Sequence, residues 1–272
     1  MTGDRTALRR FSLNQATTKH WPLPDVVAGC VAAGVPGIGL WREPVAEHGL
    51  ARTAKLVRDA GLEVTTLCRG GFFSAGGWRD ENLRAIEEAA TLGAPVLVLV
   101  SGGLPEGSRD IDGARARVAD AIAELAPHAE AAGVRLAIEP LHPMFTADRC
   151  VIATLGQALD IAERFDPGVV GVVVDAYHVW WDNTVYAQIA RAGEWIASFQ
   201  VCDWITPLPE GVLLGRALPG DGCIELRRLR AAVDRAGYTG PIEVEVFNAD
   251  VWARPGEQVL AASIDGYLRE VV

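Results

Sequence analysis

The stretch VVDAYHVWWDN, residues 173–183, contains the pattern that decides the fold. An apolar run typical of a buried strand stops at an acid, Asp175, and His178 and two tryptophans follow within six residues. Apolar strands that run up to a polar turn and are followed by a segment of helical period recur along the whole chain. The fold therefore has to be built from repeated strand–turn–helix units.

The repeated unit predicts a closed barrel. Alternating strands and helices imply parallel pairing, and nearly continuous apolar strands imply burial on both faces. An open, doubly wound sheet is the alternative, but no GxGxxG or GxxxxGK[ST] follows the first strand, which continues as SLNQATTKH. The expected strands are residues 9–14, 37–41, 62–68, 95–101, 134–139, 169–175, 197–203 and 241–247, with helices between them at 24–34, 46–61, 80–93 and 113–133. We expect an α/β fold, a single (β/α)8 TIM barrel, as one domain over residues 1–272.

Composition excludes several classes of protein. Half of the 272 residues are hydrophobic, the formal net charge is −10, and no block of Lys and Arg appears, so nucleic acid is not an expected partner. The five cysteines form no CxxC pair, which is typical of free thiols in a reducing compartment. No apolar run reaches the roughly 20 residues that a membrane span needs, and the N-terminus has no signal-peptide pattern. We expect a cytoplasmic protein without a membrane partner.

Acidic and amide side chains stand at the ends of the later strands. Glu139 ends the fifth predicted strand, Asp175 the sixth, Gln200 lies in the seventh, and Glu243 and Glu245 share one face of the eighth. In a barrel these strand ends meet at one mouth. Carboxylates buried there would repel one another unless a cation lay among them. An all-oxygen set of Glu, Asp, Gln and Glu suits Mg²⁺ or Mn²⁺ better than Zn²⁺.

These motifs resemble the xylose isomerase-like TIM-barrel superfamily, the sugar phosphate isomerase/epimerase type of protein. The resemblance covers nearly the whole chain and is most specific in LAIEP (136–140), VVDAYHVWW (173–181), LPGDGCIEL (218–226) and GYTGPIEVEVF (237–247). It implies that a divalent metal is held by Glu139, Asp175, Gln200 and Glu245. Ketose 3-epimerases usually have His where this chain has Gln200, and Gln there resembles the 3-dehydroshikimate dehydratase branch. The endonuclease IV branch needs many histidines, and this chain has five.

Two histidines are candidates for contact with a substrate. His178 follows Asp175 in a DxxH pattern that in similar families lies next to the substrate, and a neutral-range pKa would let it transfer a proton. A hydrogen-bonded histidine at a helix start is the alternative. His142, between two prolines in EPLHP, either faces the mouth or supports a rigid loop.

Four further residues follow predicted strands or precede conspicuous loops. Arg69, in LCRGGFF, could clamp a substrate hydroxyl or carboxylate, or pair with a glutamate of the site. Arg216 resembles a substrate-contacting arginine of ketose epimerases, although a solvated loop arginine would look the same. Trp181 belongs to a set of aromatic residues at strand ends on which a sugar could stack, and His20 follows the first strand. The LPGDG loop is explained by a tight turn as well as by a phosphate site.

Three functions are consistent with this sequence. The first is a metal-dependent isomerase or epimerase of a sugar or keto-sugar, in which Glu139 and Glu245 serve as base and acid around an enediolate. The second is a dehydratase or lyase acting on a keto-cyclitol, a dehydroshikimate-like acid or a 3-keto-glycoside, with His178 or His142 protonating the departing oxygen. The third is a non-catalytic barrel that binds a sugar or a protein. We expect a small carbohydrate or cyclitol as the substrate, and a homo-oligomer is possible by analogy with other barrels.

Overall fold

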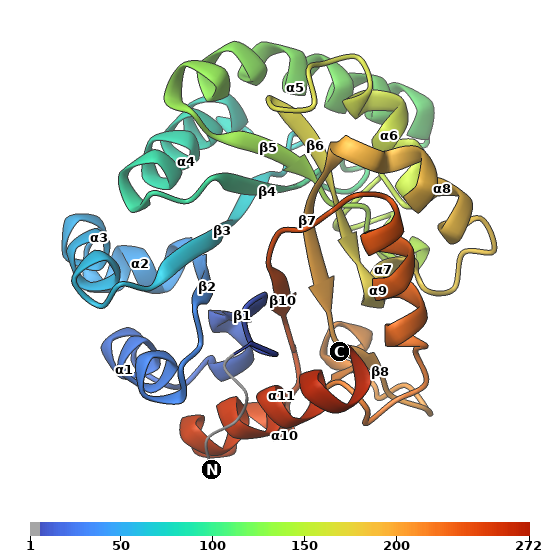
Figure 1. Ribbon diagram of the computed structural model, residues 1–272. Helices are drawn as coiled ribbons and strands as arrows, with labels where there is room; N and C mark the ends of the chain where they lie inside the picture. The colour runs from blue at the N-terminus through green and yellow to red at the C-terminus, as the bar shows by residue number, and fades with distance from the viewer. Residues whose placement is uncertain (1–5) are drawn as a thin grey trace.

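The computed structural model describes residues 6–272 and confirms the barrel. All eight neighbouring pairs are parallel, and the strand order closes on itself as β1-β10-β7-β6-β5-β4-β3-β2. Figure 1 looks into the ring of strands and shows the helices arranged around it. The barrel strands are β1 (Phe11–Asn14), β2 (Gly37–Trp41), β3 (Glu63–Gly71), β4 (Val96–Val100), β5 (Arg135–Ile138), β6 (Val170–Asp175), β7 (Ile196–Val201) and β10 (Ile242–Val244).

Helices connect successive strands and cover the outside of the barrel. They are α1 (Leu23–Ala33), α2 (Arg42–His48), α3 (Leu50–Asp59), α4 (Trp78–Leu92), α5 (Ile111–Ala132), α6 (Leu155–Ala162), α7 (Ala176–Val179), α8 (Val185–Ala192), α9 (Leu226–Arg235), α10 (Ala249–Trp252) and α11 (Gly256–Glu270). The prediction of a single helix over 46–61 is wrong. Gly49 adopts φ +99°, a conformation that L-residues rarely adopt, and it divides the segment into α2 and α3.

A short antiparallel ribbon that the sequence did not predict lies after β7. It pairs β8 (Asp203–Trp204) with β9 (Arg216–Ala217), so that Asp203 is opposite Ala217 and Trp204 is opposite Arg216. The expected strand 197–203 included Asp203, whereas in the structure β7 ends at Val201 and Asp203 begins β8. This ribbon returns the chain toward the barrel and brings Arg216 back to the strand ends.

The barrel has two kinds of interior surface. An apolar cluster of Cys68, Val96, Val98, Ala137, Val173 and Ala197 fills one part of the lumen, and Trp41 packs against it. The remaining wall is polar although it is buried: it contains Ser12 and Asn14 of β1, Thr65 and Thr66 of β3, Gln200 of β7 and Glu243 of β10. Gln200 of this polar wall is paired with Asp175, a residue of the site described below.

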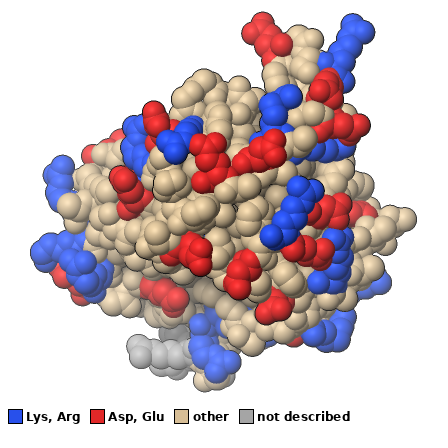
Figure 2. Space-filling model, turned by 90° about the horizontal axis from the view of Figure 1, so that it is seen from above, with Lys and Arg blue, Asp and Glu red and all other residues tan. Residues whose placement is uncertain are grey.

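The charge of the surface and the polarity of the helices describe the exterior of the molecule. In the view of Figure 2, acidic and basic side chains are interspersed over the face of the molecule. Between residues 6 and 272, every helix is either too short or too polar to cross a membrane.

Candidate active site

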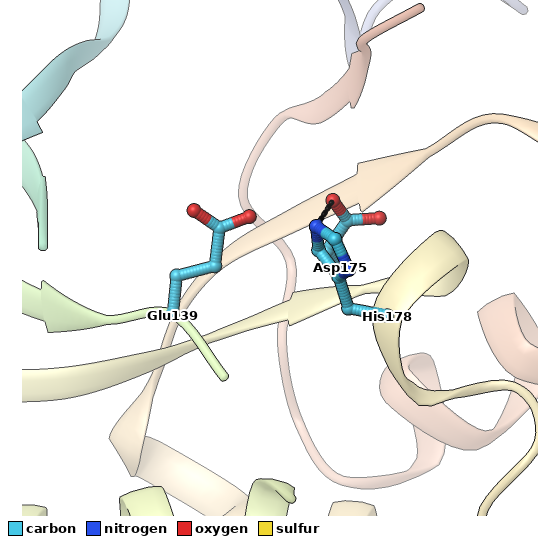
Figure 3. A group of neighbouring side chains, drawn as sticks. All are labelled: Glu139, Asp175 and His178. Carbon is cyan, nitrogen blue, oxygen red and sulfur yellow. Dashed lines mark ion pairs between the residues drawn. The ribbon is translucent and has the colours of Figure 1, made fainter. Parts of the chain in front are cut away.

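Three predicted side chains meet where β5 and β6 end. Glu139 follows β5, Asp175 is the last residue of β6, and His178 lies one turn later in α7 (Figure 3). Asp175 also begins α7, because its Oδ1 accepts a hydrogen bond from the backbone N–H of Tyr177 at 2.8 Å. One ligand atom from each of the three residues lies within 4.8 Å of the others, and each side chain is buried.

Arg216 lies inside this acidic cluster. Its Nη1 is 3.0 Å from Oδ2 of Asp175 and 3.0 Å from Oε2 of Glu245, so one guanidinium nitrogen bridges acids from two strands. Its side chain is only 4% exposed, which rules out the alternative of a solvated loop arginine. The guanidinium supplies positive charge between carboxylates that would otherwise repel one another.

The two glutamates that the sequence singled out have unusual pKa values. Burial raises the pKa of Glu139 well above its ordinary value, and the nearby charges of Asp175 and Glu245 raise it further. Burial also raises the pKa of Glu245 to about 8, although the charge of Arg216 and the nearby indole of Trp41 act in the opposite direction. Burial therefore favours the protonated form of both carboxyl groups relative to an exposed glutamate.

Gln200 supplies an amide oxygen with no partner. In the barrel its Cα is level with those of Asp175 and Glu243, one on either side. Its Nε2 donates to Oε1 of Glu243 at 3.1 Å, whereas its Oε1 is buried and accepts no hydrogen bond from the described residues. A buried oxygen without a donor is a free ligand atom, and amide oxygens are ligands for hard divalent cations. An unpartnered amide oxygen in a barrel strand beside Asp175 is therefore compatible with a divalent cation at this mouth.

A cavity lies beside two neighbours of the acidic cluster, Trp41 and Phe247. Its volume is about 360 Å³, within the range of small-molecule sites, and it is lined in part by Gln15, Lys19, Trp41 and Phe247. Two of its lining residues lie near the acidic cluster: the Trp41 side chain is close enough to lower the pKa of Glu245, and the Phe247 ring lies 5.1 Å from the guanidinium carbon of Arg216.

With this geometry established, comparison with known proteins identifies the family. A family profile described as xylose isomerase-like TIM barrel matches residues 27–271. The chain belongs to this family. A crystal structure of protein SMc04130 from Sinorhizobium meliloti 1021 is 47% identical, with a TM-score of 0.93 over 97% of this chain and 98% of that chain.

Family members of known activity match less closely. A 3-dehydroshikimate dehydratase from Pseudomonas aeruginosa is 30% identical over 90% of this chain, and an inosose isomerase from Halalkalibacterium halodurans is 26% identical over 53% of it. The chain spans 38% of the dehydratase and 50% of the isomerase. The IolI protein, whose crystal structure contains zinc, is 23% identical with a TM-score of 0.81 over 96% of this chain and 98% of that chain, a likeness that shows the fold.

His178 is the most constrained of the candidate histidines in this xylose isomerase-like barrel. Its Nδ1 accepts the backbone N–H of His142 at 3.1 Å, and its Nε2 faces Nη2 of Arg216 at 3.0 Å. Burial and the charge of Arg216 lower its pKa well below the ordinary value, which keeps the ring neutral. His142 and Trp181 lie beside it: their rings are 5.2 Å apart, and the Trp181 indole donates to the His178 carbonyl.

Arg69 and His20 lie apart from the acidic cluster. Arg69 stacks on Phe72, 3.8 Å from the ring centroid, and lines a cavity of about 310 Å³ with Arg42 and Glu43. His20 is exposed and lies edge-on to Trp252, lining a different cavity. The structure thus brings Arg216, His178 and His142 to the acids, and it leaves Arg69 and His20 at other surfaces.

The LPGDG loop is held by Asp203. The Asp203 carboxylate accepts backbone N–H groups of Trp204, Gly220 and Ile224 at 2.9 to 3.0 Å. These bonds account for the loop as a tight turn and give Asp203 a structural role. Sequence reasoning missed a different group, the polar side chains Asn14, Thr65 and Thr66 that surround Glu243. The only sequence feature that could have indicated them is the occurrence of polar residues inside otherwise apolar strands.

Proposed function

We propose that this protein is a divalent-metal-dependent isomerase or epimerase of a sugar, keto-sugar or cyclitol. The observation that carries the proposal is the convergence of buried acids at the barrel mouth: Glu139 and Asp175 bring carboxylate oxygens within 4.8 Å of each other, and Arg216 connects Asp175 to Glu245 at 3.0 Å on each side. Glu139, Asp175, Gln200 and Glu245 would hold the metal, with Mn²⁺ or Mg²⁺ preferred by this all-oxygen set. Zinc belongs in any test, because the IolI crystal structure contains a zinc atom.

The chemistry divides between the metal and the side chains. A bound divalent cation would polarise the substrate carbonyl and the adjacent hydroxyl. One glutamate takes the proton from the carbon beside the carbonyl; the C–H electron pair moves toward the carbonyl oxygen and an enediolate forms. The other glutamate returns a proton to the opposite face of that carbon, which epimerises it. Alternatively, the proton returns to the neighbouring carbon while the proton of the adjacent hydroxyl moves to the former carbonyl oxygen, which isomerises the substrate. The guanidinium of Arg216 places positive charge beside the developing oxyanion.

The surroundings of the acids support a substrate of sugar size. The cavity of about 360 Å³ has aromatic walls at Trp41 and Phe247 and charged groups at Lys19, Glu43 and Glu47. Aromatic faces stack on sugar and cyclitol rings, and an adjoining wall of this kind also excludes water. Trp181, which is 37% exposed beside His142, offers a second such face.

A dehydratase is the second candidate, because the dehydratase from Pseudomonas aeruginosa matches 90% of this chain and Gln200 replaces the usual histidine. Elimination expels an oxygen β to the carbonyl and needs a proton donor for it. His178 is poorly placed for this role, because it is buried, its Nδ1 accepts the backbone N–H of His142, and its Nε2 lies between Nη2 of Arg216 and Oδ2 of Asp175, at 3.0 and 3.8 Å. His142, half-buried beside Trp181, is the better donor. The occupied state of His178 is the reason for ranking isomerisation first.

Proton NMR in D₂O distinguishes these reactions. The metal-loaded protein is incubated with ketoses, keto-inositols, dehydroshikimate and 3-keto-glycosides, using Mn²⁺, Mg²⁺ and Zn²⁺ in turn and removing the metal before spectra are recorded. Deuterium entering one carbon of an intact skeleton supports an isomerase or epimerase. An alkene or a freed aglycone supports the lyase instead, and no change in any substrate contradicts both.

Variants connect the reaction to the site. Glu139→Gln and Glu245→Gln should each lower the rate of deuterium entry by at least about 100-fold, since each removes one partner of the proton transfer. Glu225→Gln is the matched control, because its side chain is 69% exposed at the start of α9 and lies outside the cluster. Equal rates in all four proteins would show that the two buried glutamates do not carry the reaction.

A further inference from the structure

Glu243 is a fully buried acid to which the proposed mechanism assigns no role. It lies in β10 two residues before Glu245, on the same face of the strand, and it is 1% exposed. Four neutral donors converge on its carboxylate: Asn14 and Gln200 on Oε1, at 2.7 and 3.1 Å, and Thr65 and Thr66 on Oε2, at 2.9 Å each. None of these donors is a cation, so oriented dipoles hold the acid.

The absence of a side chain at Gly39 leaves room for the Glu243 carboxylate. A Cβ added to Gly39 of β2 would lie 2.5 Å from Cδ of Glu243, which is too close for any side chain. Glycine at this position lets the acid pack directly against the strand backbone.

The neighbouring donors show that Oε1 of Glu243 acts as a hydrogen-bond acceptor. Asn14 cannot turn its amide around, because its Oδ1 already accepts from the backbone N–H of Ala16 and the indole N–H of Trp41. Its Nδ2 therefore has to donate to Oε1 of Glu243, which makes that oxygen an acceptor. An acceptor at this point also attracts the nitrogen end of the Gln200 amide, and Oε1 of Gln200 is left without a donor among the described residues.

We propose that Glu243 is a positioning residue: by accepting from Nε2 of Gln200 it keeps Oε1 of that amide free of protein donors and available to a metal. The inference rests on the proposed function, since it concerns one ligand of the proposed metal. A side-chain amide can bind a cation only through oxygen, so a partner that chooses the orientation controls affinity. Loss of such an outer partner typically costs about 10- to 100-fold in metal affinity.

The test measures the Mn²⁺ dissociation constant of the full chain by the EPR signal of free Mn²⁺. In Glu243→Gln the new amide can donate to Oε1 of Gln200 and capture the ligand atom, so Mn²⁺ binding should weaken at least about 10-fold. Thr66→Val is the control: it removes one donor from the other carboxylate oxygen and should change affinity less than about 3-fold while costing similar stability. Circular dichroism establishes that each variant is folded.

A swapped pair separates positioning from general damage. In Gln200→Glu/Glu243→Gln the carboxylate and the amide exchange places, residue 243 donates, and residue 200 again presents an oxygen, so affinity should return to within about 3-fold of the wild type. Wild-type affinity in Glu243→Gln, or a folded swapped pair that binds no better than Glu243→Gln, would overturn the inference.

Variants that do not fold leave other measurements. If Glu243→Gln does not fold, the Mn²⁺ affinity of the swapped pair alone decides. If neither variant folds, the side-chain NH₂ signal of Gln200 in the Mg²⁺-loaded wild type decides, and rapid exchange with solvent would overturn the inference. A wild type that binds no Mn²⁺ would overturn the proposed metal site itself, which is a distinguishable result.

Discussion

Arg216 shows how a single residue can change the electrostatics of a site. Asp175 and Glu245 stand at the ends of the two strands that flank β7, and the guanidinium bridges them at 3.0 Å on each side. Its other nitrogen faces Nε2 of His178 at 3.0 Å. A bound metal would neutralise the same carboxylates, so the arginine should matter most when the metal is absent.

Replacement of Arg216 tests this charge balance. Arg216→Met keeps much of the volume and removes the charge, leaving buried carboxylates unpaired. We expect the free energy of unfolding to fall by roughly 3–5 kcal/mol in EDTA and by clearly less with saturating Mn²⁺. Urea unfolding in the two conditions measures both values. An equal loss with and without Mn²⁺ would show that the metal and the guanidinium do not neutralise the same acids.

Glu245 makes the stability of the metal-free protein depend on pH. Its pKa is about 8 in the folded protein against an ordinary value of 4.5, so the folded state keeps a proton that the unfolded chain has released. This contribution to stability is complete below about pH 4.5 and is lost as the pH rises toward 8. Between pH 5 and 8 in EDTA, the wild type should therefore lose more stability than Glu245→Gln. Parallel urea-unfolding curves for the two proteins would contradict the shifted pKa.

At the scale of the elements, the regular strands were predictable and the irregular connections were not. Apolar runs between turns located all eight barrel strands, because burial on both faces leaves a continuous hydrophobic signal. The ribbon of β8 and β9 has two residues in each strand, too short for any periodicity. Arg216 is in this ribbon, so its burial depends on long-range contacts that local sequence does not report.

The element β2 carries a sharp test of packing. Gly39→Ala would place a methyl group 2.5 Å from the Glu243 carboxyl carbon and should lower the free energy of unfolding by about 1–3 kcal/mol. Gly76→Ala is the control, because no described atom outside its immediate chain neighbours lies within 4 Å of the place its methyl group would take. Urea unfolding of both variants measures the difference. Equal stability would mean that Glu243 does not fill this space.

At the scale of the whole molecule, the sequence predicted which residues would converge but not how they would interact. Placing strand ends at one mouth of a barrel was enough to bring Glu139, Asp175 and Glu245 together. The pairing of Arg216 with two acids, and the polar wall around Glu243, required the register between strands far apart in the sequence. That register determines which side chains inside a barrel form hydrogen bonds and ion pairs with one another, and no sequence motif indicates it.

The cysteines give a test of the fold as a whole. Cys30, Cys68, Cys150 and Cys202 are buried and Cys223 is exposed, and all five are free. Burial raises the pKa of Cys30 to about 12, which disfavours the reactive thiolate. One thiol should react rapidly with a chromogenic disulfide reagent in native protein, and five in urea. Loss of the rapid phase in Cys223→Ser would identify its source, whereas several fast thiols in the native protein would contradict this packing.

A crystal structure of the protein grown with Mn²⁺, with the ion located by anomalous scattering, tests the central claim most directly. We predict one ion bound by oxygen atoms of Glu139, Asp175, Gln200 and Glu245. An ion bound instead by Glu139, Asp175 and His178, with Arg216 still between Asp175 and Glu245, would contradict the proposed metal site.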